Sequence, residues 1–240
     1  MLGVYLNILG IFIGSVFAVA GPRQISMSAQ TRLKALIGLF TIYFGLKLVW
    51  GSINGSFWQT AKQLTILLVA MSLGNLCGRL MRWHEPGKKI GAEAREALQA
   101  LATDPKSPMR KRGFHICTAL FCVNPLGWSG AIQSGLTNYY EPLVVKGVID
   151  GLACLGFVFL FGWPVILTMV PVFLVEGVLA LSAHQLEPWL HNHALLDSVG
   201  AVNGFLIFTI GILMLNVRKV EVVDYFPSLA IAPIITYFWK

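Results

Sequence analysis

The chain has 240 residues, of which 56% are hydrophobic and 12% are charged, and its formal net charge is +7. Soluble globular proteins carry about 25% charged residues, so this composition excludes an ordinary soluble domain. It indicates an all-α, polytopic membrane protein in contact with the lipid bilayer. The basic residues lie in short loops and form no basic, aromatic platform, which argues against a nucleic-acid partner.

Eight apolar runs approach the length of about 20 residues that a transmembrane helix needs. The sequence GWP at 162–164 separates the fifth run from the sixth as a tight helical hairpin, and Pro227 and Pro233 weaken the last run. We therefore predict a single transmembrane domain, residues 1–240, with about eight spans. Six or seven full spans with a re-entrant segment is the alternative. The predicted spans are 4–20, 33–50, 62–81, 114–136, 144–161, 164–184, 198–216 and 222–238.

Lysine and arginine gather in the odd-numbered loops, which by the positive-inside rule face the cytoplasm. With eight spans, both termini are then predicted to lie outside. The third loop, residues 82–113, is the one sizeable polar segment, and its EAREALQALA stretch (93–102) predicts a short helix at the cytoplasmic membrane surface. The basic residues of the first and seventh loops are Arg23, Arg32, Lys34, Arg218 and Lys219.

Two similar segments suggest an internal repeat. GLFTIYFGLKL (38–48) and GFLIFTIGILM (204–214) both place glycines seven residues apart. Spans 1–3 would then repeat as spans 6–8 with inverted topology, an arrangement frequent in transporters; chance similarity between glycine-rich apolar segments is the alternative. Glycines four residues apart also predict close contacts between helices. These pairs are Gly10/Gly14, Gly74/Gly78, Gly147/Gly151 and Gly200/Gly204.

The fourth predicted span contains the segment NPLGWSGAIQSG (124–135), which is a poor helix former. Pro125 lacks an N–H and clashes with the carbonyl four residues earlier, so we predict that span 4 is broken at Asn124-Pro125. Non-helical backbone persists in a membrane only where protein or a wet cavity covers it. We expect the break to line a cavity, as in many transporters; a proline kink satisfied by neighbouring helices is the alternative. The predicted substrate-binding residues are Asn124, Ser129, Gln133 and Asn203.

Ionisable groups within a bilayer cost about 2.5–3.5 kcal/mol each and therefore mark functional sites. Asp150 and Glu176 each lie thirteen residues from Trp163, so both should lie at one depth, about 20 Å from the hairpin. Two adjacent carboxyls do not both stay ionised, so the pair is predicted to couple transport by holding a proton or a cation. Separate hydrogen bonds for each carboxyl are the alternative. Lys47 and Lys146 are expected near span ends, with their ammonium groups reaching water.

The cysteines and histidines indicate no disulfide, metal or catalytic site. The four cysteines lie in apolar stretches without a CxxC pair, so we expect free thiols and neither a disulfide nor a metal site. Three histidines in the predicted sixth loop match no metal-ligand spacing, and we expect them to be solvated. Because no Ser/His/Asp set occurs within the spans, we expect neither an enzyme nor a cofactor. The histidines are His184, His191 and His193; the mid-span amides Asn7, Asn75 and Asn203 either link helices or line a cavity.

Several segments resemble the bacterial domain-of-unknown-function 554 family. They are MLGVYLNILGIFIGSVFA, RLKALIGLFTIYFGL, FCVNPLGWSGAIQSGL, VVKGVIDGLA, PVFLVEGVLAL and the run from Ser198 to Ile234. The resemblance covers nearly the whole chain outside the third loop. It implies an inner-membrane protein of undefined activity, in a family commonly labelled as transport proteins, and so supports the membrane class more than the function. The family pattern has glycine where this chain has Asn124 and glutamine where it has Glu176. If an amide is usual at 176, Asp150 becomes the better single candidate for ion coupling.

These observations predict a transporter of a small solute or ion in the bacterial inner membrane, coupled to H⁺ or Na⁺ through Asp150 and Glu176. A homo-oligomer is compatible with this reading. The alternative is a non-transporting scaffold or regulator that acts through its basic cytoplasmic loop. The substrate, the coupling ion and the direction of transport do not follow from the sequence.

Overall fold

The structure is a computed structural model that describes residues 1–21, 26–53, 55–104 and 107–239. The predicted loop residue Arg23 lies outside these residues, as does Lys106. Over the described ranges the chain is helical and contains no strand. The α-helices are α1 (Leu2–Ala20), α2 (Met27–Ser52), α3 (Phe57–Leu80), α4 (His84–Thr103), α5 (Gly113–Cys122), α6 (Pro125–Thr137), α7 (Glu141–Phe161), α8 (Met169–Asn192), α9 (Leu196–Met214) and α10 (Ser228–Phe238). Three short 3₁₀ helices are η1 (Pro108–Arg112), η2 (Trp163–Thr168) and η3 (Val222–Tyr225).

Six helical segments among the described residues are long and apolar enough to cross a membrane. They correspond to α1, α2, α3, α7, η2 with α8, and α9. The fourth predicted span is divided between α5 and α6, and the eighth forms a shorter apolar helix, Val222–Phe238. The all-helical membrane class is therefore confirmed, whereas the number of eight spans is not.

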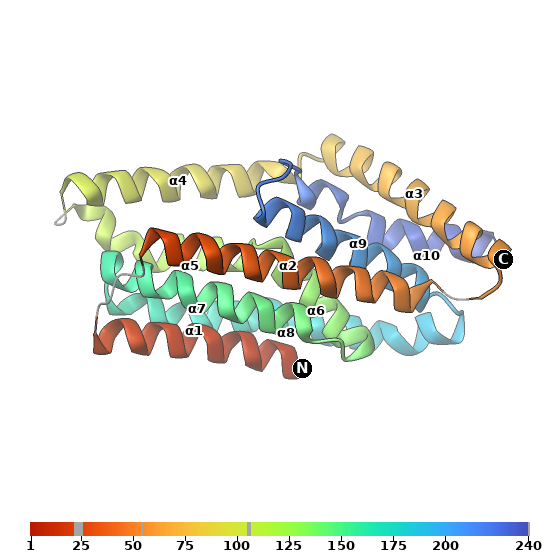
Figure 1. Cartoon of the computed structure of the whole chain (residues 1–240), viewed down its shortest axis with the longest axis horizontal. Helices are drawn as coiled ribbons and strands as arrows, with labels where there is room; N and C mark the ends of the chain where they lie inside the picture. Colours follow the sequence, from red (N-terminus) through yellow and green to blue (C-terminus); the bar gives the residue numbers. More distant parts are fainter. Residues whose placement is uncertain (22–25, 54, 105–106, 240) are drawn as a thin grey trace.

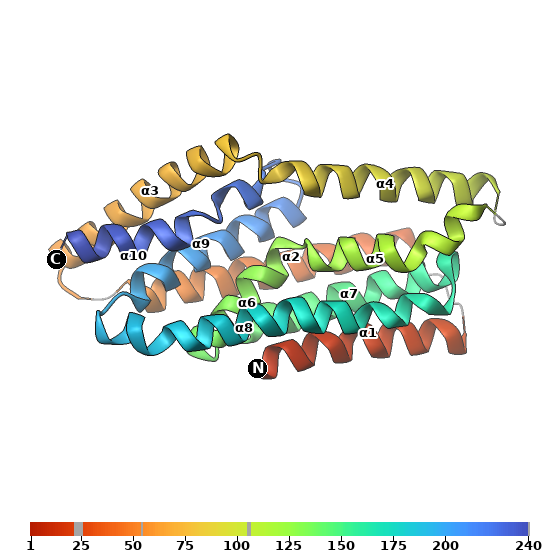
Figure 2. The same ribbon diagram turned by 180° about the vertical axis from the view of Figure 1, so that it is seen from behind.

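Helices α1 and α7 lie side by side along the bundle (Figures 1 and 2) and contact through glycines. A Cβ atom on Gly151 would lie 2.5 Å from the main-chain oxygen of Gly10, and one on Gly147 would lie 3.0 Å from Asn7 Cα. Only glycine permits this approach. The close van der Waals packing that results replaces the hydrophobic attraction, which is absent between helices in lipid. The predicted helix contacts of the spaced glycines are thus confirmed at this interface.

The two similar segments, 38–48 and 204–214, pack against each other on α2 and α9. A Cβ atom on Gly204 would lie 2.8 Å from the main-chain oxygen of Gly45, and one on Gly211 would lie 3.0 Å from that of Gly38. The pairing of the first glycine of one segment with the last of the other makes the helices antiparallel. Each segment supplies the same small surface to the other; the inverted repeat of spans 1–3 and 6–8 stays a prediction.

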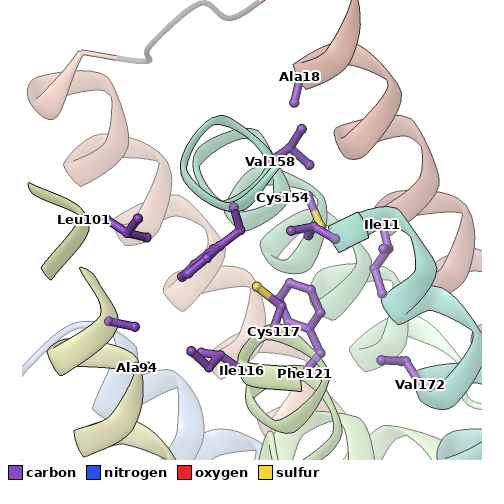
Figure 3. Close-up of a cluster of buried hydrophobic side chains, with 13 residues drawn as sticks. Ile11, Ala18, Ala94, Leu101, Ile116, Cys117, Phe121, Cys154, Val158 and Val172 are labelled. Carbon is purple, nitrogen blue, oxygen red and sulfur yellow. The ribbon is translucent and has the colours of Figure 1, made fainter. Parts of the chain in front are cut away.

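The third loop forms a longer helix than the sequence predicted. Helix α4 runs beside α5 in Figures 1 and 2, and its buried Ala97 and Leu101 join a core with α1, α5, α7 and α8. Figure 3 shows this core, in which Ile11, Cys154 and Val172 are fully buried. Polar contacts also tie this segment to the bundle or to itself. His84 Nδ1 lies 3.0 Å from Asp224 Oδ1, and Lys88–Glu221 and Arg112–Glu93 are ion pairs.

The prediction of a solvated sixth loop is wrong in one respect. Helix α8 continues to Asn192, so His184 and His191 are helical residues rather than loop residues. His193 follows directly, and its Nδ1 lies 2.8 Å from the main-chain oxygen of Trp189. The apolar spacing of the first half of α8 continues through LEPWL, and Pro188 does not end the helix.

Candidate functional site: a buried ionic cluster

Four buried polar side chains meet where α1, α7 and α8 come together. The ammonium group of Lys146 makes a very short contact with Asp150 one turn along α7, and it lies 3.1 Å from Glu176 Oε1 on α8. From α1, the amide of Asn7 donates to both oxygens of Glu176, at 2.8 and 2.9 Å. Each of these four side chains is at most 2% exposed. The cluster is therefore an ionic site held away from the surface of the bundle.

The prediction that Lys146 reaches water is wrong, because its side chain is fully buried. It is the cation that joins the two predicted carboxyls, and Glu176 in addition accepts the interhelical hydrogen bonds of Asn7. The signal was present in the sequence: Lys146 and Asp150 are four residues apart, a spacing that places opposite charges together on a helix. A span boundary drawn at residue 144 hid it, because α7 begins at Glu141.

Lys47 behaves as predicted for a lysine near a span end. Its side chain is 51% exposed and pairs with Glu141 at 3.4 Å, while the ammonium lies 5.5 Å from the centre of the Tyr139 ring. The Tyr139 hydroxyl donates to the main-chain oxygen of Phe44. Burial, with the nearby Glu141 carboxylate second, raises the pKa of this phenol above its ordinary value. These contacts join α2 to the start of α7.

Helix α6 covers the ionic cluster through Gly127. A Cβ atom at this position would lie 2.6 Å from Lys146 Cε and 2.9 Å from Glu176 Oε1. A residue with a side chain would therefore push into the ion pair, so only glycine allows α6 to cover the cluster this closely. The helix break and the carboxyl pair were predicted separately. The start of α6, just after the break, lies against the carboxyl pair.

The chain leaves helical geometry at Asn124, where the backbone is extended. The Asn124 side chain accepts a hydrogen bond from the amide of Leu126 at 3.0 Å, which caps α6, and Pro125 occupies the first turn where its missing N–H is not needed. The indole of Trp128 donates to the main-chain oxygen of Cys122 at 2.6 Å. Protein groups therefore satisfy two of the backbone groups at the break, the Leu126 amide and the Cys122 carbonyl.

We expect Trp128→Phe to destabilise the protein by about 0.5–1.5 kcal/mol, because it removes the hydrogen bond from the indole to the part-buried Cys122 carbonyl. The ring remains able to pack against Phe226. Thermal unfolding of the purified protein in detergent measures the loss. The matched control is Trp163→Phe, since Trp163 is 64% exposed; equal effects of the two substitutions would contradict the role of the indole.

Three of the four predicted substrate-binding residues lie together on α6 and α9. The Asn203 amide donates to the main-chain oxygen of Ser129 at 2.9 Å and to Gln133 Oε1 at 3.0 Å, and Gln133 donates in turn to the Thr137 hydroxyl. Ser129, Gln133 and Asn203 are buried. Within the described residues, the Ser129 hydroxyl and Asn203 Oδ1 have no hydrogen-bond partner. The amide cluster therefore retains unused polar groups.

A cavity of about 490 Å³ lies elsewhere, between α6, α8, α9 and α10. Its lining is apolar and includes Leu136, Leu186 and Leu229. It contains none of the ionic or amide cluster residues, so it is not the cavity that was predicted at the break. In the described part of the chain, no group of three or more His, Cys, Asp or Glu side chains is arranged to hold a metal ion.

The fold and the cluster define a class: an all-helical membrane protein whose apolar helices contact the bilayer and enclose charged side chains. Residues 2–237 match the model of the family described as "Protein of unknown function (DUF554)". The chain belongs to this family, which confirms the resemblance found in its sequence.

Two bacterial relatives are similar over nearly their whole lengths. The "Uncharacterized membrane protein YdfK" of Bacillus subtilis (strain 168) is 23% identical over 237 residues, covering 99% of this chain and 96% of the relative. The "Uncharacterized protein YqgA" of Escherichia coli (strain K12) is 21% identical over 239 residues, covering 100% and 97%. No solved structure matches the chain.

Proposed function

We propose that this protein transports a small solute or ion across the bacterial inner membrane and couples that transport to H⁺ or Na⁺ at Asp150 and Glu176. The buried ionic cluster carries the proposal. Charged groups within a membrane bundle are costly, and they typically mark ion or proton pathways. Two carboxyls around one ammonium leave one negative charge without a partner, which is what a site for a transported cation requires.

The solute is assigned to the amide cluster of Ser129, Gln133 and Asn203, where two buried polar atoms are unused. Gln133 lies six residues beyond Gly127 on α6, a separation of about 9 Å at 1.5 Å per residue. A movement of this one short helix would therefore act on both clusters. Asn124 holds the start of that helix through its cap. In this proposal the basic loops face the cytoplasm and both termini lie outside.

Flux through reconstituted vesicles tests the proposal. Proteoliposomes containing a trapped pH indicator or a trapped sodium indicator would receive a panel of amino acids, carboxylates, sugars and inorganic ions under an imposed H⁺ or Na⁺ gradient. We expect wild type to show solute-dependent ion flux and Asp150→Asn to lose it, with Asp104→Asn as the matched control on the exposed segment after α4. Full flux in Asp150→Asn would remove this carboxyl from the mechanism, and no flux with any probe would oppose transport.

The same variants separate transport from the scaffold alternative. That alternative assigns function to the third loop, whose basic run is Arg110, Lys111 and Arg112. If the scaffold alternative holds, Asp150→Asn should leave the protein's effect on the cell unchanged, and neutralising the basic run should abolish that effect. Two contacts favour transport over the scaffold alternative. Arg112 already pairs with Glu93 at 2.7 Å, and α4 packs on the bundle, so less of the third loop is available to a partner.

A further inference from the structure

The charges of the ionic cluster do not balance. Lys146 supplies one positive charge, whereas Asp150 and Glu176 supply two negative charges when both are ionised. Among the described residues, no second cationic side chain pairs with either carboxyl. Because an uncompensated charge is very costly in a buried site, the cluster needs one further positive charge.

Hydrogen-bond geometry shows which carboxyl is arranged to stay ionised. Glu176 faces donors on both oxygens: Asn7 donates to each of them, and Lys146 contacts Oε1 as well. A carboxyl oxygen that carries a proton has to face an acceptor, and donors occupy both positions here. Glu176 is therefore arranged as a carboxylate and forms an ion pair with Lys146.

Asp150 has the complementary surroundings. Its Oδ2 contacts the Lys146 ammonium, so its other oxygen is left to carry a proton. The Asn7 nitrogen is used by Glu176, whereas Asn7 Oδ1 is buried and has no donor within the described residues. A proton on Asp150 brings the net charge of the cluster to zero, because the charges of Lys146 and Glu176 then balance.

We propose that the cluster is a site for a single proton, in which Asp150 is protonated while Lys146 and Glu176 remain an ion pair. As the coupling ion, this proton rests on the proposed function; as a bound proton, it does not. The groups that face the site are Asn7 from α1, Lys146 from α7 and Glu176 from α8, with the thiols of Cys122 and Cys154 nearby.

Infrared spectroscopy of the full chain in detergent tests the site without any transport assay. At neutral pH, wild type should show the carbonyl band of a buried protonated carboxyl, shifted in D₂O. The band should disappear in Asp150→Asn and remain in Glu176→Gln and in the control Asp197→Asn. Sodium should leave it unchanged.

Labelling provides a second measurement if a variant does not fold. Wild type containing ¹³C-carboxyl aspartate should show the band at lower frequency, and wild type containing labelled glutamate should not. Absence of the band, its shift with labelled glutamate, or its loss on adding Na⁺ would overturn the proposal. A band assigned to Asp150 in a protein that shows no solute-dependent flux would support the proton site while opposing transport, so the two failures are distinguishable.

Discussion

Replacing Lys146 with methionine is expected to lower the free energy of unfolding by about 3–5 kcal/mol, because it removes one partner of a buried ion cluster and leaves charge without compensation. Methionine keeps most of the length of the lysine side chain, so the cost comes from the lost charge rather than from a cavity. Thermal unfolding in detergent, followed by loss of monodisperse protein, provides the measurement.

Two further variants locate the cause of that loss. Lys47→Met removes an exposed pair with Glu141, and we expect a change of about 1 kcal/mol or less. Combining Lys146→Met with Asp150→Leu and Glu176→Met removes every charge from the cluster and should recover most of the stability, since no unpaired ion remains. Wild-type stability in the single Lys146→Met variant would show that the ammonium is not a buried partner of the carboxyls.

Gly151→Ala is expected to cost about 1–3 kcal/mol, because the added methyl group forces α1 and α7 apart. Its Cβ would lie 2.5 Å from the main-chain oxygen of Gly10, a distance at which one helix has to move. The same shift would displace Asn7 from Glu176, so the ionic cluster should also be perturbed. Thermal unfolding measures the first effect, and the infrared band of the protonated carboxyl reports the second.

Gly156 provides the matched control on the same helix. A Cβ atom there would meet nothing within 4 Å, so Gly156→Ala should be neutral or gain up to about 1 kcal/mol from the better helix propensity of alanine. If Gly151→Ala and Gly156→Ala behaved alike, the close approach of α1 and α7 would not be a requirement of the fold.

The sequence by itself determined the membrane class, most helix positions, the helix boundary at Asn124-Pro125 and the choice of Asp150 and Glu176 as neighbouring candidate residues. These features depend on local properties: the length of apolar runs, the missing N–H of Pro125 and the cost of a carboxyl in lipid. Each of these properties can be recognised from a short stretch of sequence. The glycine pairs were predicted as contacts for the same reason, although their partner helices were not.

Only the tertiary structure decided what meets at the site. Lys146 was predicted at a span end, but it lies at the centre of the cluster because α1, α6 and α8 pack around it. Asn7 donates hydrogen bonds to Glu176, which is 169 residues away in the sequence. Gly127 lets α6 cover Lys146 and Glu176. The rotation of each helix about its axis selects which side chains face one another, and packing against distant segments sets that rotation, which spacing along one helix does not contain.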